Sequence, residues 1–279
     1  MERAKKEKCP SHLFISLGGI IMDYWAERNI KAQQAITNRS IKEIEKQVGE
    51  YYKSAAHNTV GGFLNTYNKI LRQIDKGAEP TPALLYRLDT YWKQQTQLTK
   101  ELRVLGDKQT ELFLKKFKQQ FIDVYNAIAI QGEANYSTIS ETTVEHMIKQ
   151  IWANDGKSWS SRIWTNTNQL QEALNEELMN CLLIGGDTRN LKSRLMDEFG
   201  VSYNRADTLI KTECANIQTQ AAAQRYKDAG LKQFEVWADE DERRCDVCGG
   251  LHQKRYYLGE KIPIPAHPRC RCCILPVVE

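Results

Sequence analysis

Proline is missing from the long middle of this chain: of the 279 residues, seven are proline, and all seven lie outside residues 83–262. A proline-free stretch of that length lets long helices run without interruption, which argues against a β-sandwich or a proline-rich linker protein. Long hydrophobic runs are missing too. The apolar segment Leu13–Met22 has ten residues, whereas a bilayer core requires about 20. We therefore expect no membrane contact.

A large excess of one charge is also absent. The chain has 39 lysines and arginines against 35 acidic residues, which gives a net charge of +4. That value is too small to predict a nucleic-acid-binding protein, although it leaves room for a local basic patch. Hydrophobic residues make up 41% of the chain, a share that excludes bulk disorder. The length is sufficient for two domains, each with its own core.

Apolar residues recur at helical spacing from Asp23 to about Ala229, and this periodicity predicts a mainly α protein. Caps, glycines and polar loops mark the expected helix ends. After Gly230 the alternating segment Lys232–Asp239 reads as a strand, so a small α+β unit is expected at the C-terminus. The expected helices cover residues 23–37, 41–74, 83–105, 109–130, 156–184, 191–199 and 203–229, with one more ending at residue 152.

One apolar stripe is prominent within residues 109–130. We interpret it as core packing rather than a ligand site, because a helix buries such a stripe against its neighbours. The stripe consists of Leu112, Phe113, Phe117, Phe121, Val124 and Tyr125.

The start of the chain differs from the helical body. Residues 1–21 hold a basic segment and most of the apolar run, but no small-residue cleavage site follows, so a signal peptide is not favoured. A helical pattern begins directly after Met22. We therefore expect residues 1–21 to be a non-native or mis-assigned lead-in, with translation starting at Met22.

Cysteine is concentrated at the other end of the chain, because five of the eight cysteines lie in the last 35 residues. This clustering favours a metal site in a reducing compartment over disulfides. Two short pairs, C-x-x-C and H-x-x-C, are separated by a loop, which is how a tetrahedral zinc site acquires four ligands. The ligands of this predicted structural zinc are Cys245, Cys248, His267 and Cys270, with Cys272 able to replace either of the last two.

Two alternatives remain open for this segment. Cys273 follows Cys272 directly, so the ligand set is not fixed by spacing, and the cysteines could instead be buried free thiols beside a surface histidine. A catalytic zinc would need a nearby carboxylate base. Asp241 could supply one, but a nuclease of the His-Asn-His type would also need a strand-helix unit around His252 or His267, and no helix is expected after either. We therefore expect a structural ion.

The motifs of the C-terminal half resemble the Mu F-like head morphogenesis domain of tailed phages, the minor capsid protein family. In order along the chain they are a helix with an Arg and a Thr-Glu pair, a strand ending in Trp, an Asp before C-x-x-C, and P-x-H-P-x-C-R-C. The matching residues are Arg205, Thr212, Glu213, Trp237, Asp241 and the segment Pro265–Cys272. The resemblance covers residues 165–275 strongly and the preceding helices loosely.

This resemblance implies a non-enzymatic virion component that is made in the bacterial cytoplasm and lies in the capsid interior near the portal. Its partners would be the portal protein, capsid or scaffold proteins, and non-specific double-stranded DNA. The implied fold is mainly α with a small C-terminal α+β unit stapled by zinc. Residues 22–155 would form a helical N-terminal body and 156–279 the Mu F-like domain, with helices over 156–230 and a zinc-binding β unit over 231–279.

Two surfaces follow from residue positions. Arg205, Thr212 and Glu213 share one helical face, which either makes a surface ion pair or docks on the zinc unit, with Glu213 accepting from an arginine such as Arg271. Basic residues of the C-terminal unit could contact DNA phosphates or simply be solvated. They are Arg243, Arg244, Lys254, Arg255, Arg269 and Arg271.

Two functions from other classes compete with assembly. One is a metal-dependent nuclease or toxin acting on nucleic acid, which lacks a clear base-and-ligand pair. The other is a host zinc-binding DNA adaptor, which would need a dense basic helix that the sequence does not contain.

Overall fold

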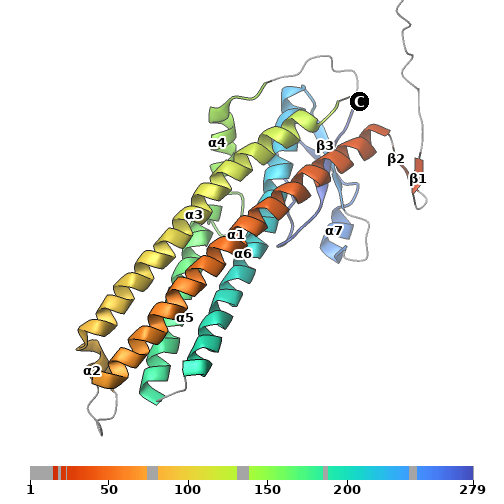
Figure 1. Cartoon of the computed structure of the whole chain (residues 1–279). Coiled ribbons are helices and arrows are strands. Elements are labelled where there is room, and N and C mark those ends of the chain that lie inside the picture. Colours follow the sequence, from red (N-terminus) through yellow and green to blue (C-terminus); the bar gives the residue numbers. More distant parts are fainter. Residues whose placement is uncertain are drawn as a thin grey trace, which may run out of the picture. The chain divides into compact units, whose positions relative to one another are not determined.

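The computed structural model describes residues 15–17, 20–22, 24–73, 81–130, 138–184, 188–238 and 244–278. Within these ranges the chain is mainly helical and has a small C-terminal sheet, so the predicted fold class is confirmed (Figure 1). The helices are α1 (Tyr24–Gln73), α2 (Pro82–Tyr86), α3 (Asp89–Ala127), α4 (Glu141–Lys149), α5 (Trp159–Ile184), α6 (Thr188–Asp228) and α7 (Asp246–Leu251). The strands are β1 (Ile15–Leu17), β2 (Ile20–Met22), β3 (Gln233–Trp237), β4 (Arg255–Tyr257) and β5 (Cys273–Pro276).

Three helices are longer than the sequence predicts. α1 continues through residues 38–40, α3 through Gly106 and α6 through Gly200, so the helix ends expected at these places are wrong. A glycine within a helix costs only about 1 kcal/mol relative to alanine, and the packing of a long apolar face outweighs that cost. The predicted strand at Lys232–Asp239 is confirmed as β3, whereas the glycines at 185–186 lie outside the described residues.

At Gly106 the missing side chain is required by packing. A Cβ atom there would lie 2.6 Å from the Trp164 ring of α5, closer than real Cβ contacts allow. Glycine therefore lets α3 and α5 approach each other inside a continuous helix. A sequence pattern alone cannot distinguish this use of glycine from a helix end.

The chain forms two compact units that interleave along the sequence. Unit 1 comprises Met1–Arg39, Gln120–Ser140 and Ala215–Glu279, and unit 2 comprises Ser40–Gln119 and Glu141–Cys214. Three helices, α1, α3 and α6, contribute residues to both. The predicted boundary between residues 155 and 156 stays a prediction.

Unit 2 is a bundle in which parts of α1, α3, α5 and α6 lie alongside one another (Figure 1). Phe113 and Phe117 of α3 pack on Trp159 of α5, with ring centroids 6.1 and 5.7 Å apart. The whole aromatic stripe predicted for residues 109–130 is buried, which confirms its role in the core. A polar contact also crosses the bundle, where Asn166 Nδ2 donates to Tyr52 Oη at 3.0 Å.

Unit 1 contains an antiparallel sheet in the order β4-β3-β5. Residues on β3 and β5 bury their apolar side chains in a cluster with Ile30 of α1, formed by Trp237, Cys273 and Leu275. The carbonyl oxygen of Ile274 accepts two buried hydrogen bonds, from Gln33 Nε2 at 3.1 Å and from Tyr226 Oη at 2.9 Å. The last strand is therefore fixed to residues of α1 and α6 within the same unit.

Only β1 and β2 are described within the lead-in, and they pair antiparallel. The expectation that translation starts at Met22 falls mostly on residues outside the described ranges and stays a prediction. None of the helices in the described part of the chain is long and apolar enough to cross a lipid bilayer.

The two helical glycines make a matched pair of tests. Gly106→Ala should lower the free energy of unfolding by about 1–3 kcal/mol, because the new methyl group collides with Trp164. Gly61→Ala should raise it by up to about 1 kcal/mol, because no atom lies within 4 Å of the new Cβ and alanine favours the helix. Urea unfolding of both variants measures the difference. Equal changes in the free energy of unfolding for the two variants would contradict the close packing of α3 on α5.

Candidate metal centre

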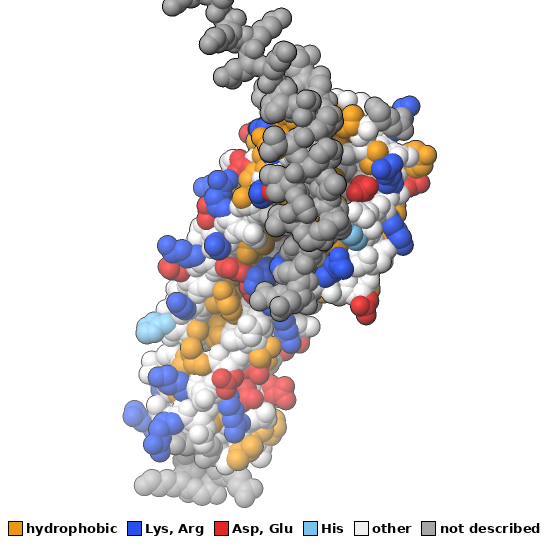
Figure 2. Space-filling view, turned by 90° about the vertical axis from the view of Figure 1, so that its right-hand side faces the viewer, with side chains coloured by type: hydrophobic (Ala, Val, Ile, Leu, Met, Phe, Trp, Pro, Cys, Tyr) orange, Lys and Arg blue, Asp and Glu red, His pale blue; other side chains and the backbone are white. Residues whose placement is uncertain are grey.

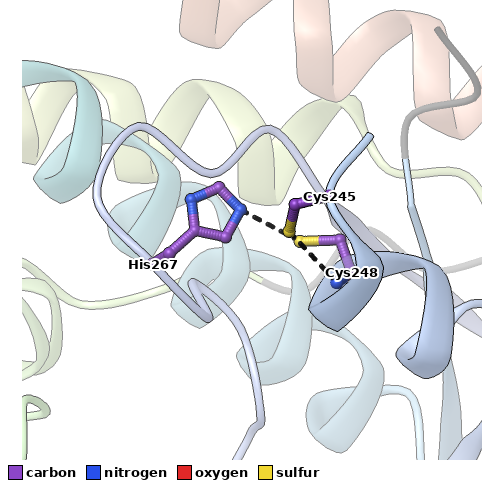
Figure 3. Close-up of side chains that lie close together, drawn as sticks. All are labelled: Cys245, Cys248 and His267. Atoms are coloured by element: carbon purple, nitrogen blue, oxygen red, sulfur yellow. Dashed lines mark hydrogen bonds between the residues drawn. The ribbon is translucent and has the colours of Figure 1, made fainter. Parts of the chain in front are cut away.

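The first chelating pair is positioned by the start of α7. Cys245 is the N-cap residue of this helix, and its Sγ accepts a hydrogen bond from the backbone amide of Cys248 at 3.4 Å. The Gly249 amide donates to the Cys245 carbonyl at 2.9 Å, which closes the turn. The Sγ atoms of Cys245 and Cys248 therefore lie close together, as the C-x-x-C spacing predicts (Figure 3).

The second pair comes from a turn ahead of β5. The Cys270 amide donates to the His267 carbonyl at 3.2 Å, and Arg269 between them has a φ of +61°. His267 Nδ1 donates to the Pro268 carbonyl at 2.8 Å, and this contact raises the pKa of His267. Because a carbonyl can only accept, Nε2 is left with its lone pair, and it lies 3.1 Å from Cys248 Sγ.

The five predicted donors form two groups that share Cys248. One group joins Cys248 to Cys245 and His267, and the other joins it to Cys270 and Cys272. Within each group the donor atoms lie within 4.8 Å of one another. Metal–sulfur bonds of about 2.3 Å in a tetrahedron place two sulfurs about 3.8 Å apart. The Sγ atoms of Cys248 and Cys270 are 3.8 Å apart. Both the chemistry of the donors and this sulfur–sulfur spacing therefore fit zinc.

Cys273 is the exception among the clustered cysteines. It lies on β5 in the apolar cluster with Ile30, Trp237 and Leu275, and it is in neither donor group. Side chains on successive strand residues point to opposite faces, which separates Cys273 from Cys272. Of the residues that the sequence left open, Cys270 and Cys272 lie in one donor group with Cys248, and His267 lies in the other group, with Cys245 and Cys248.

The crowded thiols have strongly shifted pKa values. Burial raises the pKa of Cys248 to about 12. A hydrogen bond from Cys272 lowers the pKa of Cys270 to about 5, and the same contact raises the pKa of Cys272. Backbone hydrogen bonding from Cys248 lowers the pKa of Cys245. Neighbouring thiolates repel one another, so a full set of deprotonated sulfurs at these distances needs a cation between them.

Beside the donors, His252 has a different role. Its Nδ1 accepts the Ala238 amide at 3.2 Å, and its ring packs edge-on against Trp237 at 4.6 Å. His252 therefore holds the end of β3. Asp241, which precedes the C-x-x-C, lies outside the described residues.

The three helix residues of the family motif make separate contacts in unit 2. Arg205 Nη1 donates to Gln169 Oε1 at 3.0 Å on the surface. Thr212 Oγ1 donates to the carbonyl one turn earlier. Glu213 is 2% exposed, and its Oε2 accepts from Trp152 Nε1 at 3.0 Å. The docking of this face on the zinc unit stays a prediction. No local sequence pattern indicates the contact between Glu213 and Trp152.

The residues proposed to contact DNA are exposed where the structure describes them, and Arg243 lies outside the described residues. Arg255 Nε lies 3.4 Å from Glu235 Oε2. On the face drawn in Figure 2, basic and acidic side chains are interspersed rather than segregated. The exposed members are Arg244, Lys254, Arg255, Arg269 and Arg271.

These features define a helical protein with a compact cysteine-histidine centre beside a three-stranded sheet. Residues 172–275 match the model of the family described as phage Mu protein F like protein. The match confirms the predicted Mu F-like resemblance for this C-terminal region, which includes the helix motif and all five donors. Neither the curated proteins nor the solved structures yield a match.

Loss of either cysteine of the first pair should abolish metal binding. The purified chain should hold about one zinc ion, whereas Cys245→Ser and Cys248→Ser should hold almost none and become sensitive to proteolysis beyond Gly230. Elemental analysis and limited proteolysis measure these outcomes. Cys273→Ser is the control and should keep its metal, because Cys273 is outside both donor groups. A metal-free wild-type chain that resists proteolysis there would contradict the prediction.

Glu213 and Arg205 test whether the helix motif is structural. Glu213→Ala should lower the free energy of unfolding by about 1–3 kcal/mol, because it removes the buried acceptor of Trp152. Arg205→Ala, at an exposed position, should change it by less than about 0.5 kcal/mol. Chemical denaturation compares the two. If Arg205→Ala lowered the free energy of unfolding more than Glu213→Ala, the surface contact of Arg205 would contribute more to stability than the buried contact of Glu213.

Proposed function

We propose that this chain is a non-enzymatic minor capsid protein of a phage and acts in head morphogenesis. The observation that carries the proposal is the family match over residues 172–275. That region contains the motif P-x-H-P-x-C-R-C, whose histidine and cysteines gather around Cys248. In this proposal residues 22–155 are a helical body for protein contact, and residues 156–279 are the Mu F-like domain.

The metal in this proposal is a structural zinc. Cys245 and Cys248 at the start of α7, together with the His267 turn, would hold it and so pin two segments that are 19 residues apart. A closed set of protein ligands leaves no open position for a substrate. The cytoplasm in which the chain is made would keep the thiols reduced and available for the ion.

The proposed location is the capsid interior near the portal. Partners would be the portal protein and adjoining capsid or scaffold proteins. Contact with packaged DNA would use the exposed arginines and Lys254 of the C-terminal unit, without reading sequence. Such contact would weaken steeply with salt, because it would rest on phosphate charge.

The placement of the histidines supports a non-enzymatic role over a nuclease. His267 faces Cys248 Sγ and belongs to the donor cluster, and His252 Nδ1 accepts a backbone amide. A general base needs a nitrogen within reach of a substrate proton. The lone pair of His252 Nδ1 accepts the Ala238 amide, so in the neutral ring Nε2 carries the proton. The lone pair of His267 is on Nε2, which faces Cys248 Sγ, so neither lone pair is available to a substrate.

Co-expression tests the proposal directly. The full chain, produced with the portal protein of its own gene cluster, should co-purify with it as a stable complex. Incubation of the same preparation with double-stranded DNA and Mg²⁺ or Zn²⁺ should give no strand cleavage on a gel.

The control is the His252→Asn variant, which should behave as the wild type in both measurements. Cleavage by the wild type that His252→Asn or Asp241→Asn abolishes would overturn the assembly function in favour of a nuclease. Absence of any complex with head proteins would also count against it.

A further inference from the structure

Three aromatic side chains form a cluster where α2 meets α3 in unit 2. The ring centroids of Tyr86, Tyr91 and Trp92 lie 5.7–6.0 Å apart. Tyr91 is buried, but Tyr86 and Trp92 are 51% and 52% exposed. We call this group the corner cluster. Two large rings that stay half in water are not needed for the core, and tyrosine and tryptophan are the residues that dominate binding surfaces.

The corner cluster is held in place before any partner binds. Trp92 Nε1 donates to the Tyr86 carbonyl at 2.8 Å, which ties the first turn of α3 to the end of α2. At the other end of α2, Thr81 Oγ1 accepts the Leu84 amide at 3.2 Å. Rings that are already ordered lose little conformational entropy on binding, so their burial contributes more to affinity.

The last turn of α1 extends this surface. Thr66 of α1 donates to Gln94 of α3 at 2.8 Å, and the two helices run in opposite directions (Figure 1). One to two turns further along α1, Leu71 and Arg72 therefore lie level with the first turn of α3. Leu71 is 42% exposed and Arg72 is exposed, so an apolar and a basic side chain lie at the same end of the helical bundle as the rings.

Basic residues outnumber acidic residues around the corner cluster. In the described residues 69–73 and 81–100, five residues are basic and one, Asp89, is acidic. Lys93 pairs with Asp89 at 2.5 Å, and Arg72 and Arg87 are exposed. A partner that covers the rings must therefore present acidic groups at its rim.

The composition of the surface favours a protein partner over single-stranded nucleic acid. Bases stack on the flat faces of aromatic rings, but the exposed rings of Tyr86 and Trp92 lie against each other, 6.0 Å apart and tilted by 33°, and Tyr91 meets both nearly edge-on. Asp89 pairs with Lys93 at 2.5 Å within the same turn, so this pair offers no net positive charge to a phosphate. A protein segment can pair with the two arginines.

We propose that the corner cluster is the docking site for an acidic segment of a partner protein. Tyr86 and Trp92 are the apolar anchors, and Arg72 and Arg87 bind carboxylates at the rim. The site itself follows from the surface alone, and only the identification of the partner as a head component rests on the proposed function.

A direct binding measurement tests the site. The probe is a fluorescently labelled amphipathic peptide of glutamates and leucines at helical spacing, compared with an oligothymidine of equal charge. The peptide should bind the full chain at least about tenfold more tightly than the oligonucleotide. Tyr86→Ser combined with Trp92→Ser should weaken peptide binding by about thirtyfold or more, and Arg72→Glu combined with Arg87→Glu should weaken it similarly.

The matched control is Val201→Ser, which alters an exposed apolar residue of α6 in the same unit and should leave binding unchanged. Zinc content and circular dichroism check that each variant is folded. No peptide binding, binding that the four substitutions do not alter, or preference for the oligonucleotide would each overturn the proposal.

Co-purification with the portal separates this inference from the proposed function. If the wild type binds the portal and the Tyr86→Ser, Trp92→Ser variant binds it equally well, the docking site is wrong and the assembly function stands. If the peptide results hold but no head protein binds the wild type, the site stands and the assembly function fails.

Discussion

The carbonyl oxygen of Ile274 accepts hydrogen bonds from Gln33 and Tyr226, and the C-terminal sheet depends on this contact. Three strands of three to five residues bury too little surface to be stable alone. A buried carbonyl without donors would be costly, whereas here donors from α1 and α6 meet at one oxygen. On either side of Ile274, Cys273 and Leu275 pack with Ile30. The donors His267, Cys270 and Cys272 immediately precede β5, so this contact also helps to place the candidate metal centre.

Much of the centre could be predicted from the sequence, because chelating pairs are local. Cys245 and Cys248 are joined by one turn, which brings their sulfurs together whatever the rest of the fold does. His267 and Cys270 are also joined by one turn, and each lies near Cys248 Sγ, but they belong to different donor groups. The choice among adjacent cysteines needed the register of β5, which sends Cys273 into the core. Strand register is set by pairing with β3 and cannot be read from the C-terminal segment alone.

The helix ends were less predictable for a related reason. Gly106 has the local signature of a break, but the contact that explains it is with Trp164, 58 residues later in the chain. Similarly, nothing in the helical pattern around Glu213 indicates that Trp152 donates to it. The local sequence pattern reflects helix propensity, whereas packing between residues far apart in the chain decides whether a helix continues. The mainly α class was predictable because it depends only on periodicity, which survives errors at individual glycines.

Unit 1 begins with the first turns of α1 and is completed by the last strand, and Gln33 and the Ile274 carbonyl that it contacts are 241 residues apart. During synthesis the ribosome therefore releases α1 long before β5 exists. Unit 2 can assemble on the emerging chain, but the surface around Ile30 and Gln33 stays incomplete until β5 has been synthesised. Domains fold as units while the chain is made, and this unit cannot be completed before its last strand has emerged. The candidate metal centre, whose later donors lie just before β5, cannot form much earlier.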